Sequence, residues 1–392
     1  MLTGISLPDT RSMIAKLIET PSISSTDPNI DQSNLAVINL LADWLETTGF
    51  HIEIIPVSDS KANLVATLGD REQADGLVLS GHTDTVPYDT SRWTSDPFCL
   101  TEKDNRLYGL GTADMKSFFA LVLEAVQGYQ SKTLQHPLVI LATADEESTM
   151  SGAKALVENH IPLGRYAVIG EPTSLRPIRM HKGIMMESIR VSGKSGHSSN
   201  PALGASASEG MLKLLNGLID WRKTLQDDSR NPAFAVDIPT VNIGSIHGGD
   251  NPNRICAFCE SLIDIRLMPG MDIVKTRLGL NNHLHPLLND NTKLKVEIEP
   301  LFDGIPAFET PADALIIETT EALTGCSADA VAFATEAPFF KQMGIETVVL
   351  GPGSIDQAHQ PDEFIALSQL QPTVNLVRNL IEHFCIHDQH GK

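Results

Sequence analysis

The chain has 392 residues, enough for about two or three domains, and its 42% hydrophobic and 20% charged residues are ordinary for a globular protein. Its 49 acidic residues outnumber its 29 basic ones. The net charge of −20 argues against binding to nucleic acid or anionic membranes, which attract Lys- and Arg-rich surfaces. The five cysteines indicate no disulfide framework. Because residues 1–5 begin no secretion signal and no apolar run reaches the roughly 18 residues of a membrane span, we expect a cytoplasmic protein.

The first part of the chain alternates between helix-like and strand-like segments. Apolar residues at helical spacing, or in long apolar runs, predict helices over 10–20, 33–48, 118–126 and 151–159. Alternating or continuous apolar runs predict strands over 51–55, 63–68, 77–79, 138–144 and 166–169. Continuous apolar strands interleaved with helices are typical of a mixed, largely parallel α/β sheet that is covered on both faces.

From residue 183 the pattern changes to strands with one polar face. The predicted strands cover 184–192, 242–246, 257–267 and 293–299, and the predicted helices cover 203–225 and 272–288. We therefore expect a small α+β domain over 183–302, inserted into a larger domain formed by 1–182 and 303–392. The larger domain resumes with a helix over 311–323, a strand over 347–350 and a helix over 368–384.

Acidic and histidine side chains follow the predicted strands of the larger domain. They are His82, Asp84, Asp114, Glu146, Glu147, Glu171 and His359. Ligands of open α/β sheets bind at the carboxyl ends of the strands, so these side chains are expected to meet at one site. Each also has a simpler interpretation by itself: Asp114 as a helix N-cap, the two adjacent glutamates as partners of a helix dipole, and His359 as a turn residue.

Two histidines and three carboxylates suit a pair of divalent cations, with zinc favoured and cobalt or manganese as substitutes. Two ions roughly 3.5–4 Å apart are a common hydrolytic arrangement. One of the adjacent glutamates would bind metal while the other takes the proton from the attacking water. The C-x-x-C of Cys256 and Cys259 has no second pair, and we interpret it as buried small residues rather than a zinc or redox site.

Several motifs resemble the di-zinc aminoacylase/carboxypeptidase family of metallohydrolases, in combination and in order along nearly the whole chain. The motifs are Gly81-His82-Thr83-Asp84-Thr85, Gly109-Leu110-Gly111-Thr112-Ala113-Asp114-Met115-Lys116, Asp145-Glu146-Glu147, Gly170-Glu171-Pro172-Thr173 and Ala358-His359. The resemblance implies a zinc-peptidase catalytic domain with an inserted lid and dimerisation domain. It also implies hydrolysis of an amide bond in a small N-acyl amino acid.

The resemblance further implies the role of each candidate residue. His82, Asp114 and Glu171 would hold one zinc ion, and Asp114, Glu147 and His359 the other, with Asp114 as the bridge. Asp84 would orient His82, and Glu146 would be the general base. Many family members also have a cis peptide bond after the bridging aspartate, which here would be Asp114–Met115.

For the inserted domain, the resemblance implies that the protein is a homodimer. His197 would reach the active site of the partner subunit and stabilise the oxyanion. The residues alone indicate only a histidine in a small polar loop, Lys194-Ser195-Gly196-His197-Ser198-Ser199, where exposure is the more common state.

The resemblance implies N2-acetyl-L-ornithine as the substrate. Its α-carboxylate needs donors, for which Asn253, Arg254 and Arg266 are candidates, and its terminal ammonium needs an acid, for which Glu336 is a candidate. Two alternatives remain open at this point: desuccinylation of succinyl-diaminopimelate or deacylation of a related N-acyl amino acid, and a metal-binding scaffold without catalysis.

Overall fold

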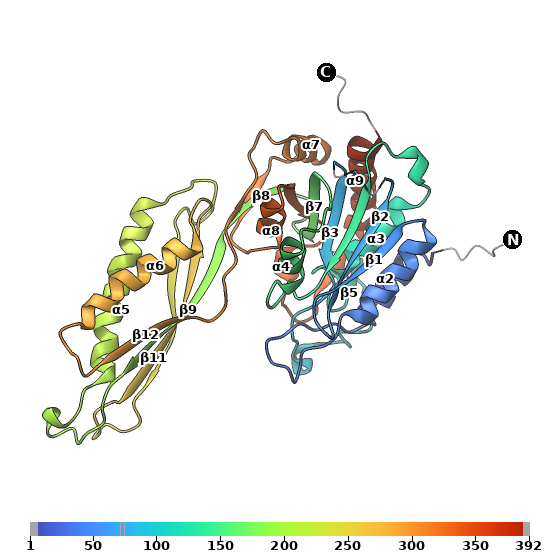
Figure 1. The fold of residues 1–392 in the computed structure, drawn as a ribbon. Coiled ribbons are helices and arrows are strands. Elements are labelled where there is room, and N and C mark those ends of the chain that lie inside the picture. Colours follow the sequence, from blue (N-terminus) through green and yellow to red (C-terminus); the bar gives the residue numbers. More distant parts are fainter. Residues whose placement is uncertain (1–6, 71, 74, 387–392) are drawn as a thin grey trace. The chain divides into compact units, whose positions relative to one another are not determined.

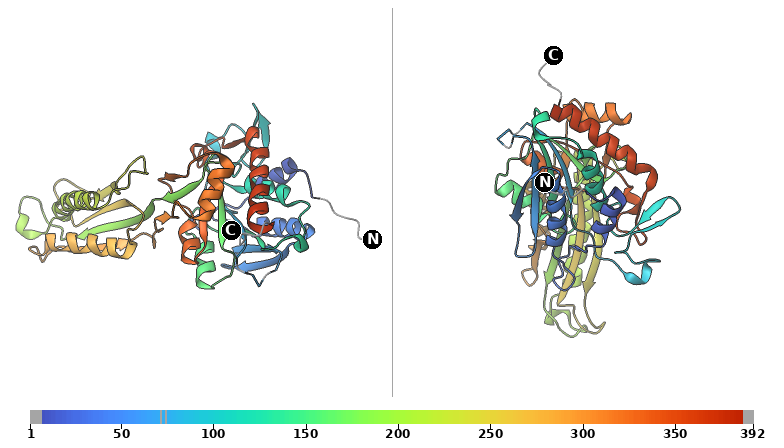
Figure 2. Two further views of the ribbon diagram at one scale, coloured as in Figure 1. Left: turned by 90° about the horizontal axis from the view of Figure 1, so that it is seen from above. Right: turned by 90° about the vertical axis from the view of Figure 1, so that its right-hand side faces the viewer.

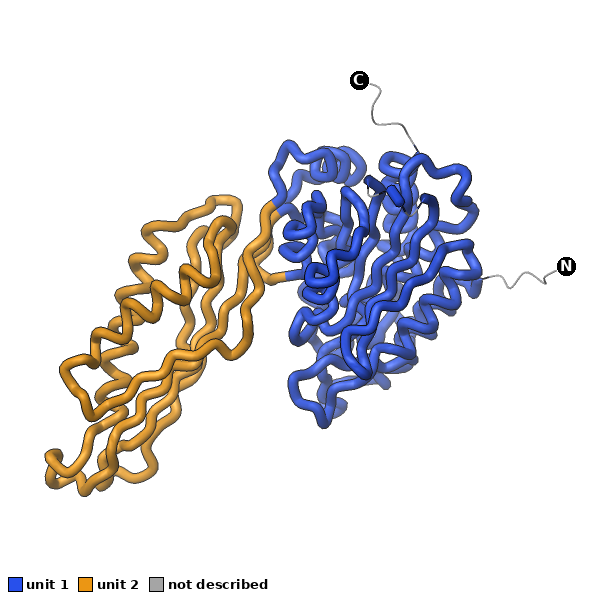
Figure 3. Tube along the Cα trace, viewed as in Figure 1, with its two compact units in different colours: residues 1–179, 310–329, 335–392 blue, residues 180–309, 330–334 orange. Residues whose placement is uncertain are grey.

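The computed structural model describes residues 7–70, 72–73 and 75–386, so residues 1–5, which we inspected for a secretion signal, lie outside it. The chain forms two compact units (Figure 3). The first unit comprises Met1–Arg179, Thr310–Asp329 and Thr335–Lys392, and the second comprises Met180–Glu309 and Ala330–Ala334. The main insertion therefore runs from 180 to 309, whereas the sequence pattern placed it at 183–302, and the short segment 330–334 also belongs to the second unit. Among the described residues, no helix is long and apolar enough to cross a membrane.

The large sheet is mixed, and its four central strands, all of them in the first unit, are parallel. Its strands run in the order β1-β2-β6-β3-β7-β15-β8-β13, with β14 paired to β8. The three pairings β6–β3, β3–β7 and β7–β15 are parallel, while the outer pairings are antiparallel. The strands are β1 (His51–Pro56), β2 (Ala62–Leu68), β3 (Leu77–His82), β6 (Leu138–Thr143), β7 (Tyr166–Pro172), β8 (Ile178–His181), β13 (Phe308–Glu309), β14 (Asp329–Val331) and β15 (Glu346–Gly351).

Helices cover both faces of this sheet (Figure 1 and Figure 2). Most of them pack on one face, and α8 packs on β15 with α4 beside it. The helices of the first unit are α1 (Thr10–Ile18), α2 (Leu35–Thr47), α3 (Lys116–Val126), α4 (Ser151–Glu158), α7 (Leu315–Thr324), α8 (Ala337–Gln342) and α9 (Leu370–Ile381). A three-stranded sheet lies apart from the large one, in the order β16 (Phe364–Ala366), β5 (Arg106–Tyr108) and β4 (Thr101–Lys103).

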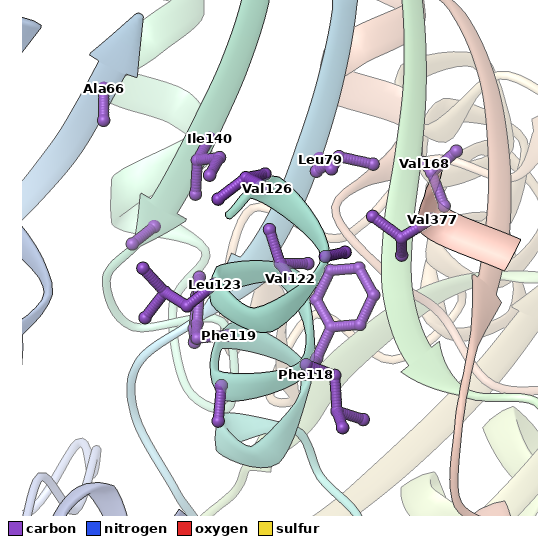
Figure 4. Packing of buried hydrophobic residues seen from close by; sticks show 14 of the residues in the cluster. Ala66, Leu79, Phe118, Phe119, Val122, Leu123, Val126, Ile140, Val168 and Val377 are labelled. Carbon is purple, nitrogen blue, oxygen red and sulfur yellow. The ribbon is translucent and has the colours of Figure 1, made fainter. Parts of the chain in front are cut away.

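The core of the first unit is built around α3, which is buried almost all round. Figure 4 shows Phe118, Val122 and Val126 of this helix among side chains from the sheet, with Val377 of α9 nearby. Such an apolar helix has no solvent face, so its first turn is held firmly at the edge of the sheet. That turn follows Asp114 directly.

Two glycines allow the strands to approach this helix closely. A Cβ on Gly170 would lie 2.3 Å from Cδ1 of Phe118, and a Cβ on Gly81 would lie 2.6 Å from Cε of Met115. Neither position has space for a side chain. Each glycine immediately precedes a candidate ligand, Glu171 or His82, so close packing places both ligands against the start of α3.

The second unit is a four-stranded antiparallel sheet with two helices. Its strands pair in the order β10 (Thr240–Gly248), β11 (Phe258–Leu267), β9 (Gly183–Ser192) and β12 (Lys295–Pro300). The helices α5 (Ala207–Asp228) and α6 (Ile273–Leu284) pack in one hydrophobic core with alternate strand residues such as Ile189 and Ile263. The α5 helix begins later than the periodicity predicted because the hydroxyl of Ser206 caps it, accepting the N–H of Glu209 at 3.3 Å.

Candidate metal centre

The parallel strands bring the candidate ligands to one edge of the large sheet. His82 is the last residue of β3, and it pairs in register with Thr143, the last residue of β6. Chain segments that leave these strand ends carry the remaining groups. Glu146 and Glu147 follow β6, Glu171 lies near the end of β7, Asp114 precedes α3, and His359 follows β15.

Asp114 lies between the two histidines. Nε2 of His82 is 3.0 Å from Oδ1 of Asp114 and 3.9 Å from Oε1 of Glu171. Nε2 of His359 is 3.7 Å from Oδ2 of Asp114 and 3.0 Å from Oε2 of Glu147. The two oxygens of one carboxylate thus face two separate sets of ligand atoms, which is the geometry of a bridging ligand.

The ring of His82 is oriented so that Nε2 can bind a cation. Its Nδ1 is 3.0 Å from the backbone carbonyl of Asp84, which can only accept, so Nδ1 carries the proton. In the neutral ring Nε2 is then an acceptor, yet it faces the carboxylate of Asp114. Two acceptors at this distance need a proton or a cation between them, and a carbonyl-held imidazole is a common arrangement of metal ligands.

Burial and like charges make this edge of the sheet favourable for cations. Burial raises the pKa of Glu171 well above its usual value, and the charge of Asp114 raises it further. Removal from water likewise raises the pKa of Glu146, with the charge of Glu171 adding to the effect. Oε1 of Glu171 is buried without a hydrogen-bond partner among the described groups. A divalent cation would favour the ionised forms and give that oxygen a partner.

Two overlapping groups of side chains have ligand atoms within 4.8 Å of one another: His82, Asp114 and Glu147, and His82, Glu146 and Glu171. The hydrogen bond from His359 to Glu147 raises the pKa of that histidine to about 9, and the charge of Asp114 acts in the same direction. Imidazole and carboxylate donors without a thiolate fit zinc, cobalt or manganese. The residues present therefore fit a pair of divalent cations.

Asp84 contacts His82 through two groups. Its backbone carbonyl lies 3.0 Å from Nδ1 of His82, and Oδ1 of its carboxylate lies 3.7 Å from the same nitrogen. The carboxylate also accepts the backbone N–H groups of Glu146 at 3.2 Å and Glu147 at 3.0 Å. Asp84 therefore links the end of β3 to the turn that carries the paired glutamates.

That turn has a second support, which sequence reasoning missed. Lys61 is 3% exposed, and its Nζ lies 2.8 Å from Oδ1 of Asp145 and 2.9 Å from Oδ1 of Asp31. Asp145 has a φ of 58° and also accepts the hydroxyls of Ser24 at 3.0 Å and Ser151 at 2.9 Å. The residue before Glu146 is thus fixed from several sides. Of these features, the sequence could indicate only the positive φ, because Asp adopts it more readily than most residues.

The predicted role of Glu336 does not fit its position. Its side chain is 0% exposed, and Oε2 accepts the hydroxyl of Thr143 at 2.9 Å. Burial raises the pKa of Glu336 to about 7. A fully covered carboxyl group has no surface for the ammonium of a substrate, so this residue belongs to the support of the β6 strand end.

The other predicted residues belong to the second unit. His197 is exposed and forms a bridge pair with Arg254, and the N–H of Ser198 donates to the carbonyl of Asn253 at 3.0 Å. Ser198 and Arg254 line a cavity of about 820 Å³, and none of the candidate acidic ligands of the first unit lines it. Arg266 lies separately on β11, with its Nε 2.9 Å from Oδ1 of Asp264.

Residues 78–383 match the family model described as peptidase family M20/M25/M40. The acetylornithine deacetylase of Photorhabdus laumondii subsp. laumondii is 49% identical over 385 residues, covering 98% of this chain and 99% of that protein.

Solved structures match as well. Aminopeptidase PepT from Bacillus cereus has a TM-score of 0.75 and 19% identity, covering 96% of this chain and 98% of that one. A protein of Bacillus subtilis, described as a dinuclear metal-binding peptidase of family M20, has a TM-score of 0.67 and 14% identity, covering 95% and 97%. At these identities the two structures establish the fold.

Divalent cations should stabilise the folded protein, because they relieve the repulsion among these carboxylates. After chelation, adding Zn²⁺, Co²⁺ or Mn²⁺ at about 100 times the dissociation constant should raise the free energy of unfolding by about 2.7 kcal/mol for each site filled. Denaturant titrations measure this, and Asp114→Asn should show a smaller gain. If none of the three cations changed the free energy of unfolding of the wild-type protein, the assignment would be contradicted.

Proposed function

The chain belongs to peptidase family M20/M25/M40, and we propose that it acts as an acetylornithine deacetylase. In this proposal it is a metal-dependent amide hydrolase that converts N2-acetyl-L-ornithine and water into L-ornithine and acetate, a step of arginine biosynthesis in the cytoplasm. The assignment of this substrate rests on the 49% identity to a relative of that name, over nearly the whole of both chains. The observation that carries the metal chemistry is Asp114 between two histidines.

The proposed cofactor is a pair of zinc ions, for which cobalt can substitute. His82, Asp114 and Glu171 would hold one ion, and Asp114, Glu147 and His359 the other. When bound, such a pair lowers the pKa of a shared water and polarises the acyl carbonyl. The contacts of Asp114 with both histidines support the shared ligand.

Glu146 is the proposed general base and acid. It accepts a proton from the attacking water as the oxygen–carbon bond forms, and delivers that proton to the amide nitrogen as the carbon–nitrogen bond breaks. Ornithine leaves with a neutral α-amine and the acetyl group leaves as acetic acid. Transfer of the acid proton to the amine through water then gives acetate and the ammonium form of ornithine. The Asp84 contact to its backbone N–H holds the residue beside the ligand Glu147, which supports this role.

His197 is proposed to stabilise the oxyanion in the active site of a partner subunit, in a homodimer formed through the second unit. Its exposure supports this role, because a histidine on the surface is available to another chain. Its Nδ1 accepts the N–H of Ser199 at 3.2 Å, which leaves Nε2 to carry the proton and donate.

The α-carboxylate of the substrate is proposed to bind donors of the second unit: Asn253, Arg254 and Arg266. If Arg266 contacts it, Arg266→Ala should raise KM for acetylornithine about tenfold or more, since hydrogen bonds to charged groups are worth about 1.5–3 kcal/mol. Arg190→Ala is a matched control, because Arg190 lies on the neighbouring strand and pairs with Glu260 at 2.7 Å. Unchanged kinetics in Arg266→Ala would remove the role.

The proposed function is tested by comparing two substrates. Acetate release from N2-acetyl-L-ornithine should exceed succinate release from succinyl-diaminopimelate by roughly 100-fold or more in kcat/KM. Chelation should abolish the activity and zinc should restore it. Faster succinate release would identify a desuccinylase instead, and no release from either substrate by the zinc-loaded protein would favour a non-catalytic metal-binding scaffold.

The roles of Glu146 and His197 are tested together in hybrid dimers. Glu146→Gln and His197→Ala should each lower kcat by about 100-fold or more in homodimers. If the two subunits carry different affinity tags, the doubly purified hybrid has one site with both residues intact and should recover about half of wild-type turnover. A hybrid no more active than the parents would show that His197 does not serve the partner's site.

A further inference from the structure

Glu363 is a buried carboxylate to which sequence reasoning assigned no role. Its side chain is 1% exposed and lies four positions after His359. Oε1 accepts the backbone N–H groups of Ala113 at 2.7 Å and Asp114 at 3.0 Å, and Oε2 accepts the N–H of Gly111 at 3.0 Å. Three donors converge on one carboxylate, 249 to 252 positions away in the sequence.

All three contacts are backbone donors, and the two oxygens of one carboxylate can accept all of them at once. Hydrogen bonds to a charged acceptor are also the stronger kind, which suits a group that must hold backbone in place.

The three bonds fix the backbone that leads to Asp114. Gly111 has a φ of 88°, and the turn 111–114 is followed by Met115, the N-cap residue of α3. Two of the bound N–H groups belong to consecutive residues, so the orientation of the peptide group that joins Ala113 to Asp114 is set by Oε1. The direction of the Asp114 side chain follows from that backbone orientation.

Glu363 lies on the same segment of chain as His359. This segment therefore acts on proposed ligands of both ions. The carbonyl of Glu363 accepts the N–H of Gly109 at 3.0 Å, and Phe364 and Ile365 continue as the strand that pairs with β5. The segment 359–366 is thereby tied to the segment 106–114. A substitution at Glu363 would therefore alter the position of Asp114 through the turn 111–114, and that of His359 through the four residues that follow it in the chain.

We propose that Glu363 is a positioning residue of the metal centre, which holds the turn 111–114 so that the two oxygens of Asp114 face the two histidines. This inference rests on the proposed role of Asp114 as the shared ligand. Glutamine cannot replace Glu363, because its amide has one oxygen and its NH₂ would face at least one of the three N–H donors.

Glu363→Gln should weaken the binding of zinc to the chelated protein by about 10- to 100-fold, as measured by calorimetric titration. It should lower kcat for acetylornithine with little change in KM, because the residue touches no substrate. Glu187→Gln is the matched control: Glu187 is a buried carboxylate of the second unit, 2.8 Å from Nε of Arg277. The control should lose stability and keep wild-type zinc affinity.

A second measurement needs no variant. In wild-type protein stripped of metal, the amide hydrogens of Gly111, Ala113 and Asp114 should remain protected from exchange, because Glu363 holds them. Rapid exchange after chelation would mean that ions organise the turn, and it would overturn the inference even if Glu363→Gln failed to fold.

The outcomes separate this inference from the proposed function. If wild-type protein binds two ions and Glu363→Gln binds them with unchanged affinity, the positioning role is overturned and the proposed function stands. If wild-type protein binds no pair of ions, both are overturned.

Discussion

The crowding of carboxylates at one edge of a buried sheet is the constraint on which the structure depends. Four parallel strands end there, and the groups that follow them cannot all be ionised without a source of positive charge. Imidazoles, backbone N–H groups and a buried lysine supply part of it. Two divalent cations would supply the remaining positive charge. The carboxylates gathered there are Asp84, Asp114, Glu146, Glu147, Glu171, Glu336 and Glu363.

The scaffold divides these acids into those that face the site and those that hold it. Asp84 and Glu363 accept backbone N–H groups, and Asp145 pairs with Lys61. Asp84 and Asp145 both fix the turn that bears the paired glutamates, and Glu363 fixes the turn that bears Asp114. The two glycines in front of His82 and Glu171 serve the same end, because they let α3 pack directly against the strand ends. Rigid placement matters because a bridging carboxylate must present both oxygens at once.

The convergence of the candidate ligands could be predicted from the sequence, and most of the contacts that support them could not. His82, Asp114 and Glu171 lie after recognisable strands or before a helix, so local pattern and the rule of strand ends suffice. Lys61 and Glu363 act across long sequence separations, and nothing near them in the chain signals a partner. Strands of two or three residues, such as β13 and β16, carry no periodicity. The burial of Glu336 could not be predicted because the sequence indicates acidity but not burial, and the contact of the Asp84 carbonyl with His82 has no sequence pattern.

The central claim is that Asp114 is shared by two ions, and anomalous diffraction from crystals of the zinc-loaded protein tests it most directly. Data collected on both sides of the zinc absorption edge should show two peaks roughly 3.5–4 Å apart, one on each side of the Asp114 carboxylate. One peak should contact His82 and Glu171, and the other Glu147 and His359. A single peak, or a pair in which Asp114 contacts only one ion, would contradict the account.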